Sequence, residues 1–201
     1  MAKVKVTKKE ADRIMKIRGN VSGTIFQSYY KLILAKKGEG NLRKVEKRMQ
    51  ELGYPVKFKE TSSFKWYPES LALLASLVSL EVFGWDEERA FDLSYEVPLY
   101  SILVKLFMKY SSMETVLREA PKYWQKHFDF GEMKCTKYDL KKRYTIVRLD
   151  GYKKYHPIQY IFIKGFSTRL FELGTGSKNV KVEQTKSLFN NDLYDEFKIT
   201  W

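Results

Sequence analysis

The spacing of the apolar residues changes at His127, and this change limits the fold more than any other feature of the chain. Before His127, apolar side chains recur three and four positions apart, as they do along one face of a helix. After His127 they alternate, as they do in a strand with one buried face. The alternation predicts strands over 130–139, 143–150, 180–188 and 193–201, and the segment 156–173 returns to helical spacing.

The last two strands show the alternation most clearly. We expect them to turn one set of residues toward the core: Val180, Val182, Gln184 and Leu188, then Leu193, Phe197, Ile199 and Trp201. Segregated helices and strands indicate an α+β fold. The prediction is an N-terminal helical layer packed on a C-terminal four-stranded antiparallel sheet, in the order β-β-α-β-β.

The first part of the chain reads as helices separated by glycine and proline. Residues 24–127 are expected to be almost wholly helical, apart from an extended piece near 56–66. The predicted helices cover 24–37 and then begin at Asn41, Pro68, Asp86, Pro98 and Ser112. Thr24 and Gln27 are expected to cap the first of them. Pro121 is expected to break the last one and restart it.

The composition is that of one folded domain. The chain has 201 residues, of which 44% are apolar and 15% aromatic, a composition that predicts a folded rather than a disordered chain. We expect a single domain over 1–201, with a helical part over 1–127 and the β-β-α-β-β part over 128–201. The sequence contains no run of about 18 apolar residues, so no transmembrane helix is predicted. The N-terminus has no apolar leader and Cys135 is the only cysteine, which favours the cytoplasm.

The charge is unevenly distributed. The net charge is +13, and residues 1–60 hold 16 basic side chains against 6 acidic ones. Such a segment can bind nucleic acid, anionic lipid or an acidic partner. The simpler interpretation is a solvated surface rich in lysine, because the basic residues alternate with core positions along helices. Nucleic-acid binding is therefore an alternative function rather than the first one.

The chain shows no catalytic or metal-binding motif. His127 and His156 are its only histidines, and with Cys135, the only cysteine, they are spread along the sequence without a clustered pair. Their spacing matches no zinc motif, and no nucleophile elbow, phosphate loop or dinucleotide fingerprint is present. Cys135 is expected to be a small core residue, His156 to cap a helix start and His127 to end a helix. We predict that the protein is not an enzyme and needs no cofactor or metal.

The aromatic residues are the more informative excess. The helix over 156–173 is apolar on nearly all sides, so it is either central to the core or shared with a partner. Gly165 in its middle leaves space that a side chain would otherwise fill. We therefore expect an apolar ligand pocket between this helix and the helical layer. Its predicted lining is Phe26, Tyr30, Trp66, Leu74, Phe107, Phe162, Gly165 and Phe166. A densely packed core without a cavity is the alternative.

Several strings of residues resemble a known superfamily over nearly the whole chain, from about Arg18 to Trp201. They are FQSYYKLI, FKWYPESLALL, EVFGWDEE, KLFMKY, PKYWQKHF, HPIQYIFIKGF and VEQTKS…YDEFKITW. They are similar to bacterial proteins of the vinyl-reductase-type ligand-binding superfamily. That superfamily also contains haem-based nitric oxide sensor domains and subunits of the Golgi tethering complex TRAPP. The resemblance implies helices packed on an antiparallel sheet, binding of a small or lipid-like ligand, and frequent dimers.

The chain departs from the superfamily at three places. Relatives commonly have a cysteine at the position of Ser187 and a histidine at the position of Asp195. The Tyr-x-Ser-x-Arg signature of the haem sensors is also missing, since Ser167-Thr168-Arg169 does not supply it. These departures argue against haem and against cysteine-based metal binding.

The first functional hypothesis is a non-enzymatic sensor or regulator that encloses a small apolar ligand. We expect it to be a homodimer, formed through the helices over 24–37 and 98–110, because both have wide apolar faces. The alternatives are a basic nucleic-acid-binding regulator and a purely structural interaction domain.

Overall fold

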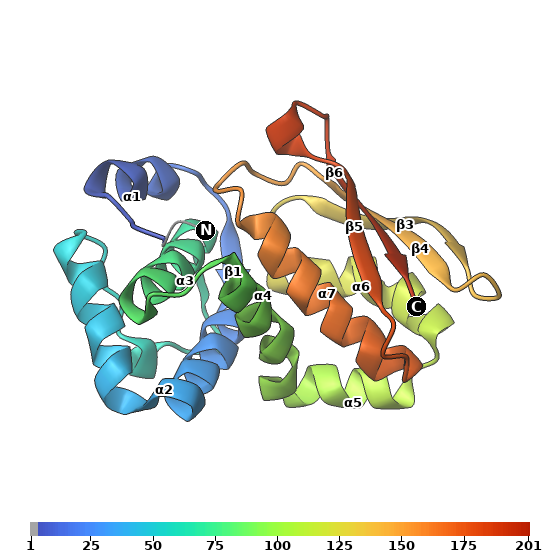
Figure 1. Cartoon of the computed structure of the whole chain (residues 1–201), viewed down its shortest axis with the longest axis horizontal. Helices are drawn as coiled ribbons and strands as arrows, with labels where there is room; N and C mark the ends of the chain where they lie inside the picture. The colour runs from blue at the N-terminus through green and yellow to red at the C-terminus, as the bar shows by residue number, and fades with distance from the viewer. Residues whose placement is uncertain (1–3) are drawn as a thin grey trace.

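The computed structural model describes residues 4–201, apart from the side chains of residues 102, 103 and 106. It has a helical half followed by a half with two β-hairpins and one helix (Figure 1). The helical half contains α1 (Lys8–Met15), β1 (Asn20–Ser22), α2 (Gly23–Glu51), β2 (Trp66–Pro68), α3 (Glu69–Phe83), α4 (Glu87–Glu96), α5 (Ile102–Tyr110) and α6 (Met113–His127). The second half contains β3 (Glu132–Asp139), β4 (Tyr144–Asp150), α7 (Gln159–Thr175), β5 (Lys181–Lys186) and β6 (Asp195–Thr200). No helix of the described chain is long and apolar enough to cross a membrane.

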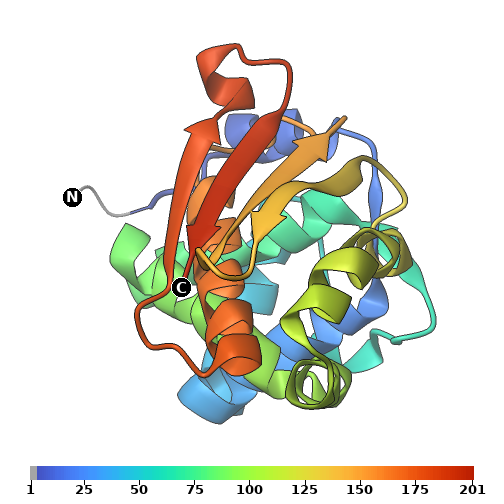
Figure 2. The ribbon, with the colours of Figure 1, turned by 90° about the vertical axis from the view of Figure 1, so that its right-hand side faces the viewer.

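The sheet confirms the predicted fold class. Its four strands are antiparallel in the order β3-β4-β6-β5, so the two hairpins join along β4 and β6. Figure 2 looks onto these strands, with α7 behind them. Val147, Leu149, Phe197 and Ile199 are buried between sheet and helices. Alternation places them there, because neighbouring side chains of a strand point to opposite faces.

Leu193 does not point inward as predicted. Its side chain is 90% exposed. The strand begins only at Asp195, so Leu193 belongs to the preceding turn, where a period of two has no meaning.

A short helix and a two-stranded ribbon precede α3 without having been predicted. The Oγ1 of Thr7 accepts a hydrogen bond from the amide of Glu10 at 3.2 Å and so begins α1. Thr7 and Glu10 have the spacing of a capping box, which was a usable sequence signal. The ribbon pairs β1 with β2, and three residues per strand are too few to give a periodic pattern.

The predicted cap of α2 is wrong. Ser22, not Thr24, is the N-cap, and its Oγ accepts from the amide of Thr24 at 3.3 Å. Gln27 instead donates from Nε2 to the carbonyl oxygen of Thr61 at 2.6 Å. The first residue of the helix must be glycine, because the chain at Ser62 passes very close to it. A Cβ atom at position 23 would lie 1.9 Å from the carbonyl oxygen of Ser62.

Two other predicted helix interruptions had different outcomes. Gly38 interrupts α2 as predicted, with a φ of 76° that only glycine adopts without strain. Pro121 does not interrupt α6, which continues to His127. Leu117 before the proline and Trp124 after it are both buried, so packing holds the helix together across the missing amide.

Helix α7 is central to the core, which decides between the two interpretations of its apolar surface. Phe162 packs against the core of the N-terminal helices, which contains Phe26 and Leu74. Phe171 packs in the core beneath the sheet. Leu170 borders a third cluster, formed by α5 and α6. One helix therefore contacts three separate cores, which explains why no side of it is consistently polar.

The space beside Gly165 is filled by α4, so the prediction that this glycine leaves room for a cavity is wrong. Helix α4 packs beside α7 (Figure 1), and residues of α4 lie against this glycine. A Cβ atom at position 165 would lie 2.1 Å from Ser94 Oγ and 2.5 Å from the carbonyl oxygen of Phe91. Glycine is required because two helix backbones meet, not because a ligand approaches.

Replacing Gly165 with alanine is expected to destabilise the protein by about 2 kcal/mol or more, since the added methyl group overpacks the α4–α7 contact. Gly40→Ala in α2 is the matched control, because a Cβ atom there meets nothing within 4 Å. It should be neutral or stabilise the protein by about 0.5–1 kcal/mol through its better helix propensity. Urea denaturation of the three proteins measures both changes. Equal stabilities of Gly165→Ala and wild type would show that α4 can move away without cost.

Candidate functional site

The eight predicted pocket residues do not surround one cavity. Phe26 and Leu74 are buried in the core of the N-terminal helices, with Tyr30 and Phe162 packed against it. The other members lie elsewhere: Trp66 is 49% exposed, Phe107 borders the α5–α6 cluster and Gly165 contacts α4. Phe166, the eighth, is half-buried on α7. Whether an apolar molecule binds any of them stays a prediction.

A small cavity does border one of these residues. It lies between α2 and α3, with a volume of about 40 Å³, and is lined by Ile25, Phe26, Tyr29, Phe58, Ala72, Ala75 and Ser76. Alanine at two positions opposite aromatic rings leaves this space. One water molecule needs about 10–15 Å³ of such space, so the cavity has room for only a few water molecules and cannot hold a lipid chain without rearrangement.

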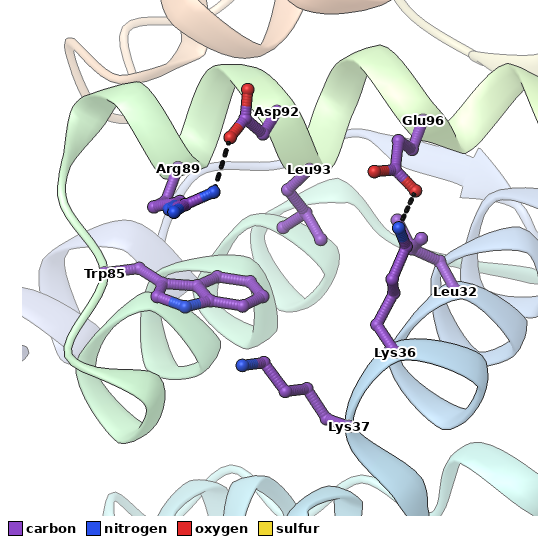
Figure 3. Close-up of a pocket in the computed structure, with 8 residues that line it drawn as sticks. All are labelled: Leu32, Lys36, Lys37, Trp85, Arg89, Asp92, Leu93 and Glu96. Atoms are coloured by element: carbon purple, nitrogen blue, oxygen red, sulfur yellow. Dashed lines mark hydrogen bonds and ion pairs between the residues drawn. The ribbon is translucent and has the colours of Figure 1, made fainter.

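A larger groove lies between α2 and α4 (Figure 3). Its volume is about 310 Å³, and its lining residues are Leu32, Lys36, Lys37, Trp85, Arg89, Asp92, Leu93 and Glu96. Leu32 and Leu93 are buried and form an apolar floor. The charged side chains surround this floor together with the ring of Trp85. The volume is at the lower end of the range of small-molecule sites, about 300–1,000 Å³.

The backbone on both sides of Trp85 is held in place. Gly84 ends α3 in the left-handed conformation, with a φ of 63°, and the amide of Trp85 donates to the carbonyl oxygen of Leu80 at 2.8 Å. Asp86 then begins α4, its Oδ1 accepting from the amide of Arg89 at 3.1 Å. The indole is therefore attached to a turn with a cap on each side, which fixes where it enters the groove.

The charges of the groove leave one cation without a carboxylate. Lys36 Nζ lies 2.9 Å from Glu96 Oε2, and Arg89 Nη1 lies 3.0 Å from Asp92 Oδ2. Lys37 forms no ion pair among the described residues. Its Nζ lies 4.8 Å from the centre of the Trp85 ring, a cation–π contact. The groove can therefore offer a ligand one ammonium group beside an aromatic face.

Sequence reasoning identified only part of this groove. Trp85 belongs to the aromatic excess of the helical half, but Lys37 was interpreted as part of the solvated basic surface of residues 1–60, and no pattern singled out Arg89. The only sequence feature that sets Lys37 apart is its position directly before Gly38, which interrupts α2. Nothing in the sequence shows that this lysine faces α4.

The histidines and the cysteine have the structural roles that were expected. The amide of Ile158 donates to His156 Nδ1 at 3.1 Å, so His156 caps the turn that leads into α7, and burial lowers the pKa of its imidazole. His127 ends α6, and burial lowers the pKa of this imidazole too. Cys135 lies in β3, where burial raises the pKa of its thiol to about 11 and suppresses the reactive thiolate. No group of three potential metal ligands occurs among residues 4–201.

A buried carboxyl group lies at the start of α3. The hydroxyl of Tyr152 donates to Glu69 Oε1 at 3.2 Å, across the junction between the helical half and the loop after β4. Burial raises the pKa of Glu69 to about 8, so the group is mostly protonated at neutral pH. No sequence pattern singled out Glu69.

Solved structures with the same arrangement of elements are available for comparison. An H-NOX protein from S. oneidensis in the Fe(II)NO ligation state superposes with a TM-score of 0.64 at 9% identity, covering 89% of this chain and 97% of the other. An oxygen-binding H-NOX domain related to soluble guanylate cyclases superposes with a TM-score of 0.61 at 11% identity, covering 89% and 92%. The fold is H-NOX-like. No protein-family model matches the chain, and no curated protein matches its sequence.

The H-NOX-like fold agrees with the superfamily that the sequence resembles, as far as architecture goes. Haem-nitric oxide and oxygen-binding domains are among the proteins which that superfamily contains. At about 10% identity the likeness establishes the fold and leaves the ligand open.

The residues present do not fit a haem. A haem iron needs an axial ligand facing a cavity of several hundred Å³. Neither cavity described above is lined by a histidine or a cysteine. His127 Nδ1 lies 3.1 Å from Thr24 Oγ1 and its ring packs on Tyr123, while both ring nitrogens of His156 face protein groups.

The positions where relatives have a cysteine and a histidine lie at the two ends of the turn between β5 and β6, Ser187 directly after β5 and Asp195 as the first residue of β6. Asp195 Oδ1 accepts from the amide of Leu188 at 2.9 Å, and Ser187 Oγ accepts from the amide of Phe189 at 3.2 Å. Both side chains are buried and are used to shape this turn. In this chain the pair is structural.

Glu69 should make the stability of the protein depend on pH. Its pKa is raised in the folded state, so its contribution is complete below about pH 4.5 and is lost as the pH rises through about 8. Relative to Glu69→Gln, the free energy of unfolding of the wild type should fall by on the order of 3 kcal/mol between pH 4.5 and 8.5. Urea denaturation across this range measures it. Glu183→Gln, at an exposed strand position, should leave the slope unchanged. A slope that survives in Glu69→Gln would assign it to other groups.

Proposed function

We propose that this protein is a non-enzymatic ligand-binding domain of the sensor or regulator type, and that the groove between α2 and α4 is its binding site. The observation that carries the proposal is Lys37, a cation without an ion-pair partner in the described chain, placed against Trp85 at the edge of an apolar floor. The H-NOX-like fold supports a ligand-binding role, because the solved structures that share it include an oxygen-binding domain.

The groove favours a small planar anion. Trp85 supplies a face on which a flat ring can stack, and Leu32 and Leu93 supply apolar contact beneath it. Both carboxylates of the groove are already paired with cations, so the charge left for a ligand is positive. A carboxylate, sulfonate or phosphate on an aromatic ring satisfies both features. No described group is placed to transfer a proton to such a ligand or to attack it, so the expected event is binding.

The ligand site can be tested with 2-naphthoate as the probe. We expect saturable binding in calorimetry, weakened about tenfold by Trp85→Ala and about fivefold by Lys37→Gln, since each removes about 1 kcal/mol or more of contact. In nitrogen–proton correlation spectra, one of the four tryptophan indole signals should shift, and Trp85→Phe should identify it.

Lys186→Gln is the matched control for Lys37→Gln. Its ammonium lies 4.6 Å from the centre of the Tyr194 ring on the sheet, a comparable lysine–aromatic contact outside the groove. This variant should bind 2-naphthoate as the wild type does. Equal loss in both lysine variants, or no shift of the Trp85 signal at saturation, would contradict the groove as the site.

An apolar or lipid-like ligand at the eight residues predicted from the sequence is the second form of the proposal. The cavity beside Phe26 gives it a starting point, although that cavity must widen to accept a chain. Thermal unfolding with and without a fatty acid tests this form, and stabilisation would support it. A melting temperature unaffected by fatty acids of several lengths would leave the groove as the candidate.

The homodimer through α2 and α5 also stays a proposal. An exposed aromatic ring at the end of α5, Tyr110, is available to such a contact. Sedimentation equilibrium at micromolar concentration should give twice the chain mass of 23.8 kDa, and Tyr110→Lys should lower it. The chain mass itself at that concentration would contradict the dimer.

A further inference from the structure

Two aromatic side chains on one turn face the solvent. Phe64 is 96% exposed and Trp66 is 49% exposed. They belong to residues 62–66, the turn that leads into β2, which we call the aromatic turn. Soluble domains normally cover large aromatic rings, because each can bury about 150–250 Å² of surface. Phe64 contributes almost nothing to the core, so its side chain is available for an external contact.

The backbone holds this turn in a defined shape. The amide of Lys65 donates to the carbonyl oxygen of Ser62 at 3.2 Å, and the amide of Ser62 donates to the hydroxyl of Tyr67 at 2.8 Å. The amide of Gly23 donates to the carbonyl oxygen of Lys65 at 2.7 Å. The turn rests on the start of α2, where only glycine leaves room for it. The two rings are therefore presented in advance, which lowers the entropy lost on binding.

The charge around the turn is positive. Lys65 lies between the two aromatic residues, and Lys57 and Lys59 precede the turn; all three are exposed. Lys59 forms an ion pair with Glu39, and the exposed Glu60 adds one negative charge to the positive charges of Lys57 and Lys65. Lys57 and Lys65 form no ion pair with the residues that the structure describes. A cation between two exposed aromatic rings, with a second one seven residues before Phe64 in the chain, matches a membrane surface, which is anionic at its headgroups and apolar beneath them.

A membrane surface fits these features better than a protein partner does. A stable protein interface buries about 800 Å² on each side, which is more than two side chains of a narrow turn can supply. A membrane needs less, since aromatic rings enter the interfacial region and lysines add attraction to anionic headgroups.

We propose that the aromatic turn docks the protein on anionic membranes, with Phe64 and Trp66 in the interfacial layer and Lys65 at the lipid phosphates. Lys57 adds to the electrostatic attraction. This proposal is independent of the ligand assigned to the groove, which lies between α2 and α4.

Co-sedimentation with vesicles tests the proposal. We expect the wild type to bind vesicles of phosphatidylcholine with 30% phosphatidylglycerol, and to bind pure phosphatidylcholine much less. Phe64→Ser with Trp66→Ser should lower the partition coefficient by about tenfold or more. Lys65→Glu should lower it at least about fivefold. The tryptophan emission of the wild type should move to shorter wavelength on binding, and in Trp66→Phe this shift should disappear while binding persists.

Matched controls separate this effect from general stickiness and charge. Leu193→Ser removes another exposed apolar side chain, and Lys178→Glu reverses another exposed lysine; both should bind as the wild type does. Circular dichroism should show every variant folded, because the altered side chains are exposed. Absence of binding to anionic vesicles would overturn the proposal. Equal loss in the control variants, or binding unchanged without both aromatic rings, would overturn it as well.

Discussion

The contact between α4 and α7 at Gly165 is the constraint on which the rest of the structure depends. Two helix backbones meet there with room for a hydrogen atom and for nothing larger. A contact this close lets α7 lie against the helical half on one side and against the sheet on the other. The three cores of the molecule then share one helix. A larger residue at this position would force α4 outward and disturb all three, because packed interiors do not yield smoothly.

Polar side chains also join α4 to α7, one and two helical turns after Gly165. Arg169 Nη1 lies 3.1 Å from Glu172 Oε2 and donates to the hydroxyl of Tyr95 at 3.0 Å, and that hydroxyl donates to Glu172. The guanidinium also lies 4.9 Å from the centre of the Tyr95 ring. Charges this deeply placed add little net stability, but breaking the set would leave one of them unpaired. They therefore specify how α4 sits on α7.

The groove depends on the same helix. Helix α4 turns Ser94 and Tyr95 toward α7, and it turns Arg89, Asp92 and Glu96 toward α2 (Figure 3). The distance between α2 and α4 sets the volume of the groove, so a shift of α4 at Gly165 would change the groove on its opposite side. The stability of the fold and the ligand binding proposed for the groove therefore both depend on the position of α4.

Local interactions made much of this protein predictable from its sequence alone. The strand period placed Phe197 and Ile199 in the core, and the caps around Gly84 and Asp86 located the turn that holds Trp85. These features depend on residues that are neighbours along the chain, and such neighbours determine periodicity and capping whatever the rest of the chain does. The fold class follows from the order of these elements.

Only the tertiary structure decided what the conspicuous residues do. From the sequence, Gly165 could mark either a cavity or a close contact between two helices, and only the position of α4 shows that it is a contact. Lys37 was interpreted as solvated surface, and only the tertiary structure shows that it lies against Trp85. The exposure of Phe64 likewise cannot be predicted from the sequence, which indicates only an extended piece near residues 56–66. The physical reason is that burial and charge pairing depend on groups that are far apart in the sequence. Local preferences do not determine which distant segment packs against a given residue.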